Sequence, residues 1–275
     1  MNEVIRQLAA RKSVRAFEDR DIPGEVRAAI LEAAAQAPTA GNQQLYTILN
    51  VTDPQLKARL AETCDHQPFI ATAPMVLIFL ADVCKWLDAY REAGCEPRAP
   101  GAGDVMLAAS DAAIAAQNAV TAAWSLGVGS CYIGDVMERC EEHREMLNLP
   151  PHVFPAAMLV LGYPTEQQAR RPKPERFNMA DIVCENVYRR KDGPALRRMF
   201  AGRCGARGYD AWMDAFCRRK YNSDFSREMT RSVEAYLRDY GLVRAEDGGE
   251  DGRPGARADS SAPGAPGVPE RGPEA

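Results

Sequence analysis

The sequence predicts one domain in which helices cover a few deeply buried strands. Residues 75–81 and 156–162 are almost continuous in apolar residues, which is typical of strands covered on both faces. Helical patterns, several of them alanine-rich, separate the predicted strands. No long linker interrupts residues 1–244 of the 275-residue chain, so a single domain over that range is the simplest organisation.

The predicted elements follow in order along the chain. The first residues form a short amphipathic helix, and Asp21-Ile-Pro23 leads into an alanine-rich helix over residues 24–37. A strand over residues 45–51 comes next. Residues 104–126 carry alanine on almost every helical face, and such a helix is usually central because its neighbours approach closely. The remaining predicted helices are residues 138–147, 209–220 and 224–240.

A change of composition marks the end of the predicted domain. Residues 245–275 are dominated by Gly, Pro, Ala and charged residues, with Val268 as the one large apolar side chain. Such a segment buries too little apolar surface to offset the entropy lost on ordering. We expect a disordered tail without a catalytic role.

Composition excludes several classes of protein. Thirty-four Lys and Arg against 38 Asp and Glu give a net charge of -4, so a nucleic-acid-binding surface is not expected. The apolar runs fall far short of the about 20 residues of a membrane span. The N-terminus lacks the apolar core of a signal peptide. We therefore expect a cytoplasmic protein.

The cysteines and histidines predict no metal site. Eight cysteines form no C-x-x-C pair and only three histidines are present, so a zinc site is not expected. In a chain of this length without a signal peptide, the cysteines are expected to be buried reduced thiols rather than disulfides.

Familiar catalytic motifs are missing from the sequence. Residues 127–134 read G-x-G-x-x-x-x-G after a predicted helix, whereas a dinucleotide loop needs G-x-G-x-x-G after a strand. G-x-S-x-G, H-E-x-x-H and P-loop patterns do not occur. Two basic segments remain, Arg11-Lys-Ser-Val-Arg15 and Arg170-Arg-Pro-Lys-Pro-Glu-Arg176. Each suits a phosphate or a solvated surface, and the residues alone leave both interpretations open.

Three segments resemble signatures of the nitroreductase family of flavin enzymes. Arg11-Lys-Ser-Val-Arg-Ala-Phe17 resembles its opening R-x-S-x-R-x-F. Ala37-Pro-Thr-Ala-Gly-Asn-Gln-Gln-Leu-Tyr46 resembles A-P-[ST]-x-x-N-x-Q-P-W, with Leu and Tyr where Pro and Trp are usual. Leu126-Gly-Val-Gly-Ser-Cys-Tyr-Ile-Gly134 resembles a G-x-G-[ST]-x-x-x-G turn, and Gly162-Tyr-Pro164 continues in family order. The resemblance spans about residues 2–190.

The resemblance implies an α+β fold, a mixed sheet flanked by helices, in an intertwined homodimer with two FMN sites at the subunit interface. The residues expected at the FMN phosphate, ribityl chain or N1/O2 edge are Arg11, Lys12, Ser13 and Arg15, with Lys173 and Arg176 at the phosphate end. Which of the last two contacts phosphate stays open, because Glu175 lies between them. Those expected to reach the flavin of the other subunit are Pro38, Thr39, Asn42 and Gln43.

The resemblance also implies where the hydride arrives. The backbone of Tyr132, Ile133 and Gly134 is expected to face flavin N5, and Gln67 the pyrimidine edge. No catalytic side chain and no metal are expected, because the cofactor carries the chemistry. NADH or NADPH would donate the hydride, and a nitroaromatic, a quinone or a similar electron-poor acceptor would take the electrons in a ping-pong mechanism.

Two other functions remain open within this interpretation. One is a family member with a dedicated substrate, such as a reductive dehalogenase or an azoline dehydrogenase. The other is a flavin-binding or storage module with negligible turnover. Residues 85–103, which include Trp86 and Tyr90, resemble no signature, and they are either a lid over the substrate pocket or a surface excursion.

Overall fold

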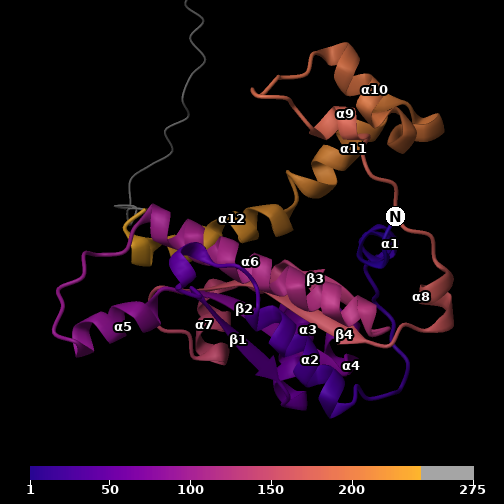
Figure 1. Ribbon diagram of the computed structural model, residues 1–275. Helices are drawn as coiled ribbons and strands as arrows, with labels where there is room; N and C mark the ends of the chain where they lie inside the picture. Colours follow the sequence, from indigo (N-terminus) through magenta and orange to yellow (C-terminus); the bar gives the residue numbers. More distant parts are fainter. Residues whose placement is uncertain (243–275) are drawn as a thin grey trace, which may run out of the picture. The chain divides into compact units, whose positions relative to one another are not determined.

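The computed structural model describes residues 1–242 (Figure 1). The predicted tail, residues 245–275, lies outside the described residues. The described chain is an α+β structure, in which helices surround a four-stranded sheet. The fold class predicted from the sequence is therefore confirmed.

The sheet has the strand order β1-β2-β4-β3, and each neighbouring pair is antiparallel. Its strands are β1 (Tyr46–Val51), β2 (Met75–Asp82), β3 (Gly129–Ile133) and β4 (Val153–Gly162). The mixed character that the resemblance implied appears within the described residues as one parallel bridge, between Ser13 and Ser130. The predicted strands correspond to β1, β2 and β4, whereas β3 was expected to be a turn.

The helices that pack on the sheet include the two that the sequence marked as alanine-rich. They are α2 (Gly24–Ala35), α3 (Pro54–Thr63), α4 (Pro68–Thr72), α6 (Ala102–Ser125), α7 (Cys140–Leu147) and α12 (Asp224–Leu237). Shorter or peripheral helices are α1 (Glu3–Ala10), α5 (Cys84–Glu92), α8 (Glu166–Arg170), α9 (Met179–Ile182), α10 (Gly193–Cys204) and α11 (Tyr209–Lys220). None of the helices within residues 1–242 is long and apolar enough to cross a membrane.

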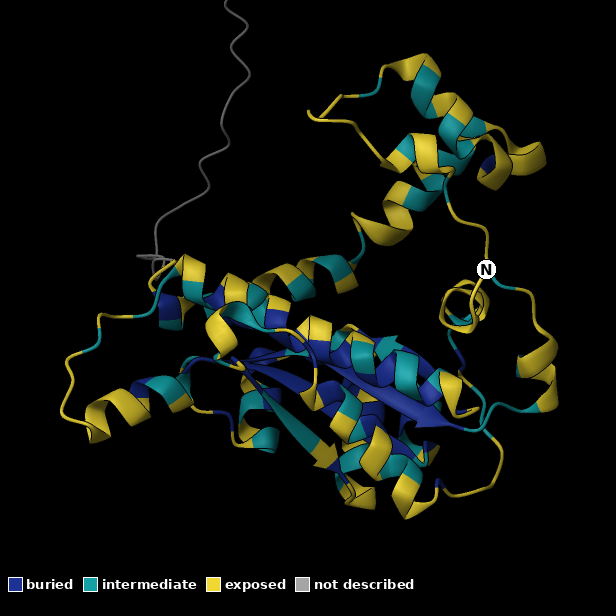
Figure 2. Ribbon diagram, viewed as in Figure 1, coloured by how far each residue is buried: buried dark blue, intermediate teal, exposed yellow. Residues whose placement is uncertain are grey.

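Strand β2 is apolar along almost its whole length because it separates two cores. Val76, Ile78 and Leu80 face one core, which also holds side chains of α3, α4, α7 and α12. Alternate residues of β2 face the other core, where the alanines of α6 pack against α2. Figure 2 shows β2 and β4 buried throughout almost their whole length. Burial on both faces removes the polar alternation that a half-exposed strand would show.

Two glycines let the segment after α1 lie directly against the sheet. A Cβ on Gly129 would lie 2.7 Å from Cγ2 of Val14, and one on Gly162 would lie 2.7 Å from the ring of Phe17. Real Cβ atoms do not approach so closely, so this contact requires glycine at both positions. The backbone N–H of Val14 donates to the carbonyl of Ser130 at 2.9 Å. The first signature is thereby fixed beside β3.

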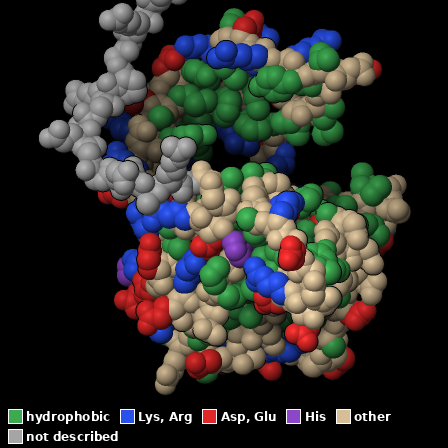
Figure 3. All heavy atoms as spheres, turned by 90° about the vertical axis from the view of Figure 1, so that its left-hand side faces the viewer, with side chains coloured by type: hydrophobic (Ala, Val, Ile, Leu, Met, Phe, Trp, Pro, Cys, Tyr) green, Lys and Arg blue, Asp and Glu red, His purple; other side chains and the backbone are tan. Residues whose placement is uncertain are grey.

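An aromatic cluster joins α10 and α11. The ring of Phe200 contacts Phe177, Tyr209 and Trp212 at centroid distances of 5.0 to 6.4 Å. Apolar side chains gather over this part of the chain in the space-filling view of Figure 3. Several large apolar residues preceding α10 are exposed, among them Met179, Ile182 and Tyr188. Exposed apolar surface of this kind is typical of a region that contacts another chain.

Candidate functional site

The first signature lies beside β3. Arg11 ends α1, where its backbone N–H donates to Gln7, and the following residues run extended. Ser13 bridges Ser130 at the start of β3. The strand then leads through half-buried Tyr132 and buried Ile133 to exposed Gly134. The structure thus brings together two groups of residues expected around the flavin.

Several cations gather at the α1 end of this segment. Lys173 Nζ donates to the carbonyls of Leu8 and Ala9 at 3.2 and 2.6 Å. Burial lowers the pKa of Lys173, and the neighbouring positive charges of Arg176 and Arg11 lower it further. Lys12 Nζ donates to the carbonyl of Ala169 at 2.6 Å and to that of Arg171. The two basic segments of the sequence are therefore one basic cluster in space.

Five cations of this basic cluster are without an ion pair within the described residues, although Arg170 at its edge pairs with Glu166. No ion pair to a carboxylate forms there at any of the five expected cationic residues, which are Arg11, Lys12, Arg15, Lys173 and Arg176. The Nε of Arg11 is buried without a hydrogen-bond partner. A buried guanidinium donor without an acceptor is costly. Unpaired cations around such a donor fit a bound phosphate, so these residues suit the phosphate end of FMN.

Gln67, another residue expected at the flavin, lies just beyond the C-terminal end of β3. The side-chain amide of Gln67 donates to Asp135 Oδ2 at 3.1 Å and to the carbonyl of Cys64 at 2.8 Å. Asp135 directly follows Gly134, so Gln67 lies beside the turn expected to face flavin N5. On the strand itself, burial raises the pKa of Tyr132 to about 12 while the charge of Arg11 acts in the opposite direction. Tyr132 is therefore a neutral phenol at physiological pH.

The second signature forms a separate loop on α6. Its central residues form a short 3₁₀ turn, Ala40–Asn42, and Asn42 is exposed with a φ of 57°. Both carboxylate oxygens of Asp111 hold the loop, one accepting from the N–H of Ala40 at 3.0 Å and the other from that of Leu45 at 3.2 Å. Asn tolerates this left-handed conformation better than most residues. The loop thereby presents its uncharged amides to solvent.

Within one chain, this loop does not join the basic cluster. The loop is fastened to the N-terminal half of α6 through Asp111, whereas Arg11 lies near Gln117 and Trp124 in the C-terminal half. No hydrogen bond links residues 38–43 to residues 11–15 or 132–134 in the described chain. One chain thus carries two partial sets of the expected flavin ligands.

The family is decided by comparison with known proteins. The model of the nitroreductase family matches residues 8–163. This chain belongs to the nitroreductase family. The resemblance recognised in the sequence is therefore confirmed.

Individual nitroreductase relatives cover most of the chain. An NAD(P)H FMN reductase from Bacillus subtilis (strain 168) is 31% identical over 239 residues, which are 86% of this chain and 91% of the relative. An oxygen-insensitive NADPH nitroreductase from Salmonella typhimurium is 32% identical over 198 residues, 72% of this chain and 80% of the relative. The solved structure of NfrA2 from B. megaterium is 28% identical with a TM-score of 0.75, covering 90% of this chain and all of that one.

One residue outside the sequence signatures, Asp111, holds the second signature in place. Asp111 is 3% exposed and is the one charged residue between Val105 and Ser125 in an otherwise small and apolar helix. A buried carboxylate needs hydrogen-bond donors, so a single charged residue among the alanines of a central helix indicates that donors from another part of the chain meet it. Here the donors are backbone N–H groups of the second signature.

Proposed function

We propose that this chain is an FMN-dependent NAD(P)H oxidoreductase that delivers electrons to a nitroaromatic, a quinone or a similar electron-poor acceptor by a ping-pong mechanism. Family membership and the FMN reductase and NADPH nitroreductase among its relatives support the cofactor and the reductant. When bound, FMN supplies an N5 atom that takes a hydride from NAD(P)H and a ring that returns the electrons to the acceptor.

The observation that carries the proposal is the set of five cations without an ion pair in the basic cluster beside β3. Arg11 and either Lys173 or Arg176 hold the phosphate by charge-assisted hydrogen bonds. Arg15 and Lys12 extend positive charge along the bound cofactor, where it stabilises the negative charge that reduction places near N1. The exposed backbone at Gly134 leaves room for a nicotinamide or an acceptor to reach the N5 position in turn.

A visible spectrum of the purified protein tests this function. We expect flavin absorption that is bleached by anaerobic NADH or NADPH and restored by menadione. A colourless protein that rejects added FMN would contradict the proposal. Tight FMN binding without NAD(P)H oxidation would also contradict it, and would instead mark a storage module.

The basic cluster can be tested directly by substitution. Arg11→Ala is expected to weaken FMN binding by about 1.5–3 kcal/mol, the usual contribution of a hydrogen bond to a charged group. Arg218→Ala is the matched control, because Arg218 is exposed on α11 and outside the cluster. Equal FMN dissociation constants for the two variants would remove Arg11 from the phosphate site.

We further propose a homodimer in which the second-signature loop serves the FMN held by the partner's basic cluster. Large apolar side chains remain exposed on α1 and α6, namely Val4, Ile5, Leu8, Met106, Leu107 and Ile114. A homodimer that buries these side chains would also supply each basic cluster with Thr39, Asn42 and Gln43 from the second chain. This supports two composite sites in the dimer.

Mixed dimers test the composite site. A dimer of one Arg11→Ala chain and one Asn42→Ala chain carries both defects in one site and neither in the other. We expect such a dimer to bind one FMN with wild-type affinity and a second one weakly. If each chain built its own site, both sites would be defective and no FMN would bind with wild-type affinity.

A further inference from the structure

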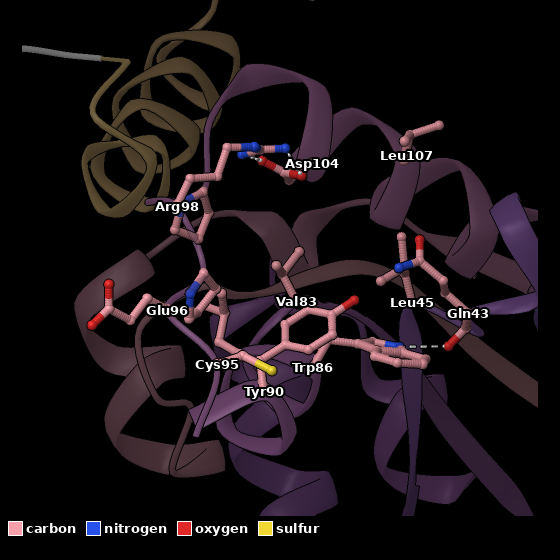
Figure 4. Close-up of a pocket in the computed structure, with 13 residues that line it drawn as sticks. Gln43, Leu45, Val83, Trp86, Tyr90, Cys95, Glu96, Arg98, Asp104 and Leu107 are labelled. Atoms are coloured by element: carbon pink, nitrogen blue, oxygen red, sulfur yellow. Dashed lines mark hydrogen bonds and ion pairs between the residues drawn. The ribbon is translucent and has the colours of Figure 1, made fainter. Parts of the chain in front are cut away.

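A pocket of about 580 Å³ lies between α5, the chain that follows it and the start of α6 (Figure 4). It is built mainly by residues 85–103, the segment that matches no family signature. Its volume is within the range of small-molecule sites. The residues that define its character are Leu45, Trp86, Leu87, Tyr90, Arg98 and Asp104.

One wall of the pocket is aromatic. The rings of Trp86 and Tyr90, one turn apart on α5, have centroids 5.6 Å apart and an interplanar angle of 42°. Trp86 Nε1 donates to the carbonyl of Gln43 at 2.8 Å, which fixes the indole. Val83, Leu87 and the prolines 97 and 100 add apolar surface. Such a wall suits a flat aromatic molecule, which gains both apolar burial and ring contacts.

The charges around the pocket disfavour anions. Arg98 is its one cationic lining residue, and its guanidinium is engaged by both oxygens of Asp104 at 2.7 and 2.9 Å. Asp104 also accepts from the N–H of Gly101 at 2.8 Å and so caps α6. Glu96 adds a carboxylate that forms no ion pair within residues 1–242. The pocket therefore offers no uncompensated positive charge to a ligand.

The pocket borders the loop expected to contact flavin. Gln43 lines the pocket and belongs to that loop. Two hydrogen bonds connect α5 to the end of this loop. Trp86 donates to the carbonyl of Gln43, and Lys85 Nζ donates to the carbonyl of Tyr46 at 2.6 Å. A molecule in the pocket would thus lie beside the flavin-contacting amides.

We propose that this pocket binds the electron acceptor, and that the acceptor is a planar aromatic molecule of one or two rings without negative charge. The inference rests on the proposed oxidoreductase function and names its substrate class. For a quinone, the two electrons and one proton of the hydride from NAD(P)H, together with one proton from water, give the hydroquinone and NAD(P)⁺.

The test compares two probes with the same ring system and different charge, menadione and 1,4-naphthoquinone-2-sulfonate. Binding to the FMN-loaded protein is measured calorimetrically without NAD(P)H, so that no turnover occurs. We expect menadione to bind at least about fivefold more tightly than the sulfonate. Tyr90→Ala is expected to weaken menadione binding about 3- to 10-fold, from the loss of an aromatic contact. Tyr221→Ala, which removes an exposed tyrosine outside the pocket, should change nothing.

A charge variant sharpens the test. Glu96→Lys is expected to tighten binding of the sulfonate and so to narrow or reverse the ratio between the probes. Equal affinities of Tyr90→Ala and the wild type for menadione would overturn the inference. The inference would also be overturned if the sulfonate bound as tightly as menadione. It would be overturned as well if neither probe bound because a second copy of the chain fills the pocket. In each of these cases, bleaching of FMN by NAD(P)H would still uphold the proposed function. If menadione binding depends on Tyr90 but NAD(P)H never bleaches the flavin, the proposed function fails and the ligand pocket stands.

Discussion

Removing the Asp111 carboxylate should release the second-signature loop and weaken the cofactor site. Asp111→Ala leaves the N–H groups of Ala40 and Leu45 without their acceptor, and the N–H of Leu45 is buried. Each unpaired donor costs about 1–3 kcal/mol, so we expect a loss of about 2–4 kcal/mol in the free energy of unfolding. Asp111→Asn keeps one acceptor oxygen and should lose about half as much.

Three measurements check this prediction. Urea unfolding gives the stability, and amide hydrogen exchange at residues 40 and 45 reports whether the loop opens. FMN affinity should fall about fivefold for each kcal/mol needed to order the released loop on binding. Asp19→Asn, an exposed aspartate without a hydrogen bond to its carboxylate in the described chain, is the control. Wild-type exchange rates and FMN affinity in Asp111→Asn would refute the role of the carboxylate.

Three further predictions follow from contacts around the site. Arg15→Ala should weaken FMN binding by about 1.5–3 kcal/mol, and an unchanged FMN dissociation constant in a fluorescence titration would exclude Arg15 from the site. Gly129→Ala should destabilise the fold by about 1–3 kcal/mol in denaturant unfolding, because the new Cβ meets Val14; added Val14→Ala should recover part of the loss, and no recovery would contradict the contact. Burial raises the pKa of Glu138 to about 7, with the charges of Asp135 and Asp65 acting in the same direction. The folded state therefore keeps this proton longer than the unfolded state, and stability should fall between about pH 4.5 and pH 7. Glu138→Gln should remove that part of the fall, and identical pH profiles of stability for variant and wild type would contradict it.

The sequence was sufficient for the elements that build the two cores. β2, β4 and α6 were predicted because burial dictates composition, apolar for strands between two cores and small for a central helix. Burial on both faces does not encode strand direction, so the antiparallel pairing appeared only in the structure. β3 was expected to be a turn because Gly127, Gly129 and Gly134 dominate the local pattern, yet Gly129 lies within the strand, where the first signature packs against it.

The sequence predicted those parts of the candidate site that lie in or near the family signatures. Residues 11–15, 132–134 and Gln67 meet around β3 as the resemblance implied, although their contacts with FMN remain predictions. The role of Asp111 was not predicted because its hydrogen-bond partners lie 71 and 66 residues away in the chain. Propensity and periodicity report on neighbours along a helix or strand, and they contain no information on which distant backbone donors a carboxylate will meet.

The absence of charge from the second-signature loop follows from how the loop is held. A carboxylate on the loop itself would repel the negative charge that reduction places on the flavin, yet two of its backbone N–H groups need a strong acceptor. Asp111 supplies that acceptor from beneath the loop, on α6, and leaves the amides of exposed Asn42 and half-buried Gln43 for the flavin recognition that we propose. Positive charge is contributed separately, by the basic cluster around Arg11. Because these two parts are fastened to opposite halves of α6, a second chain is the simplest way to bring both to one flavin.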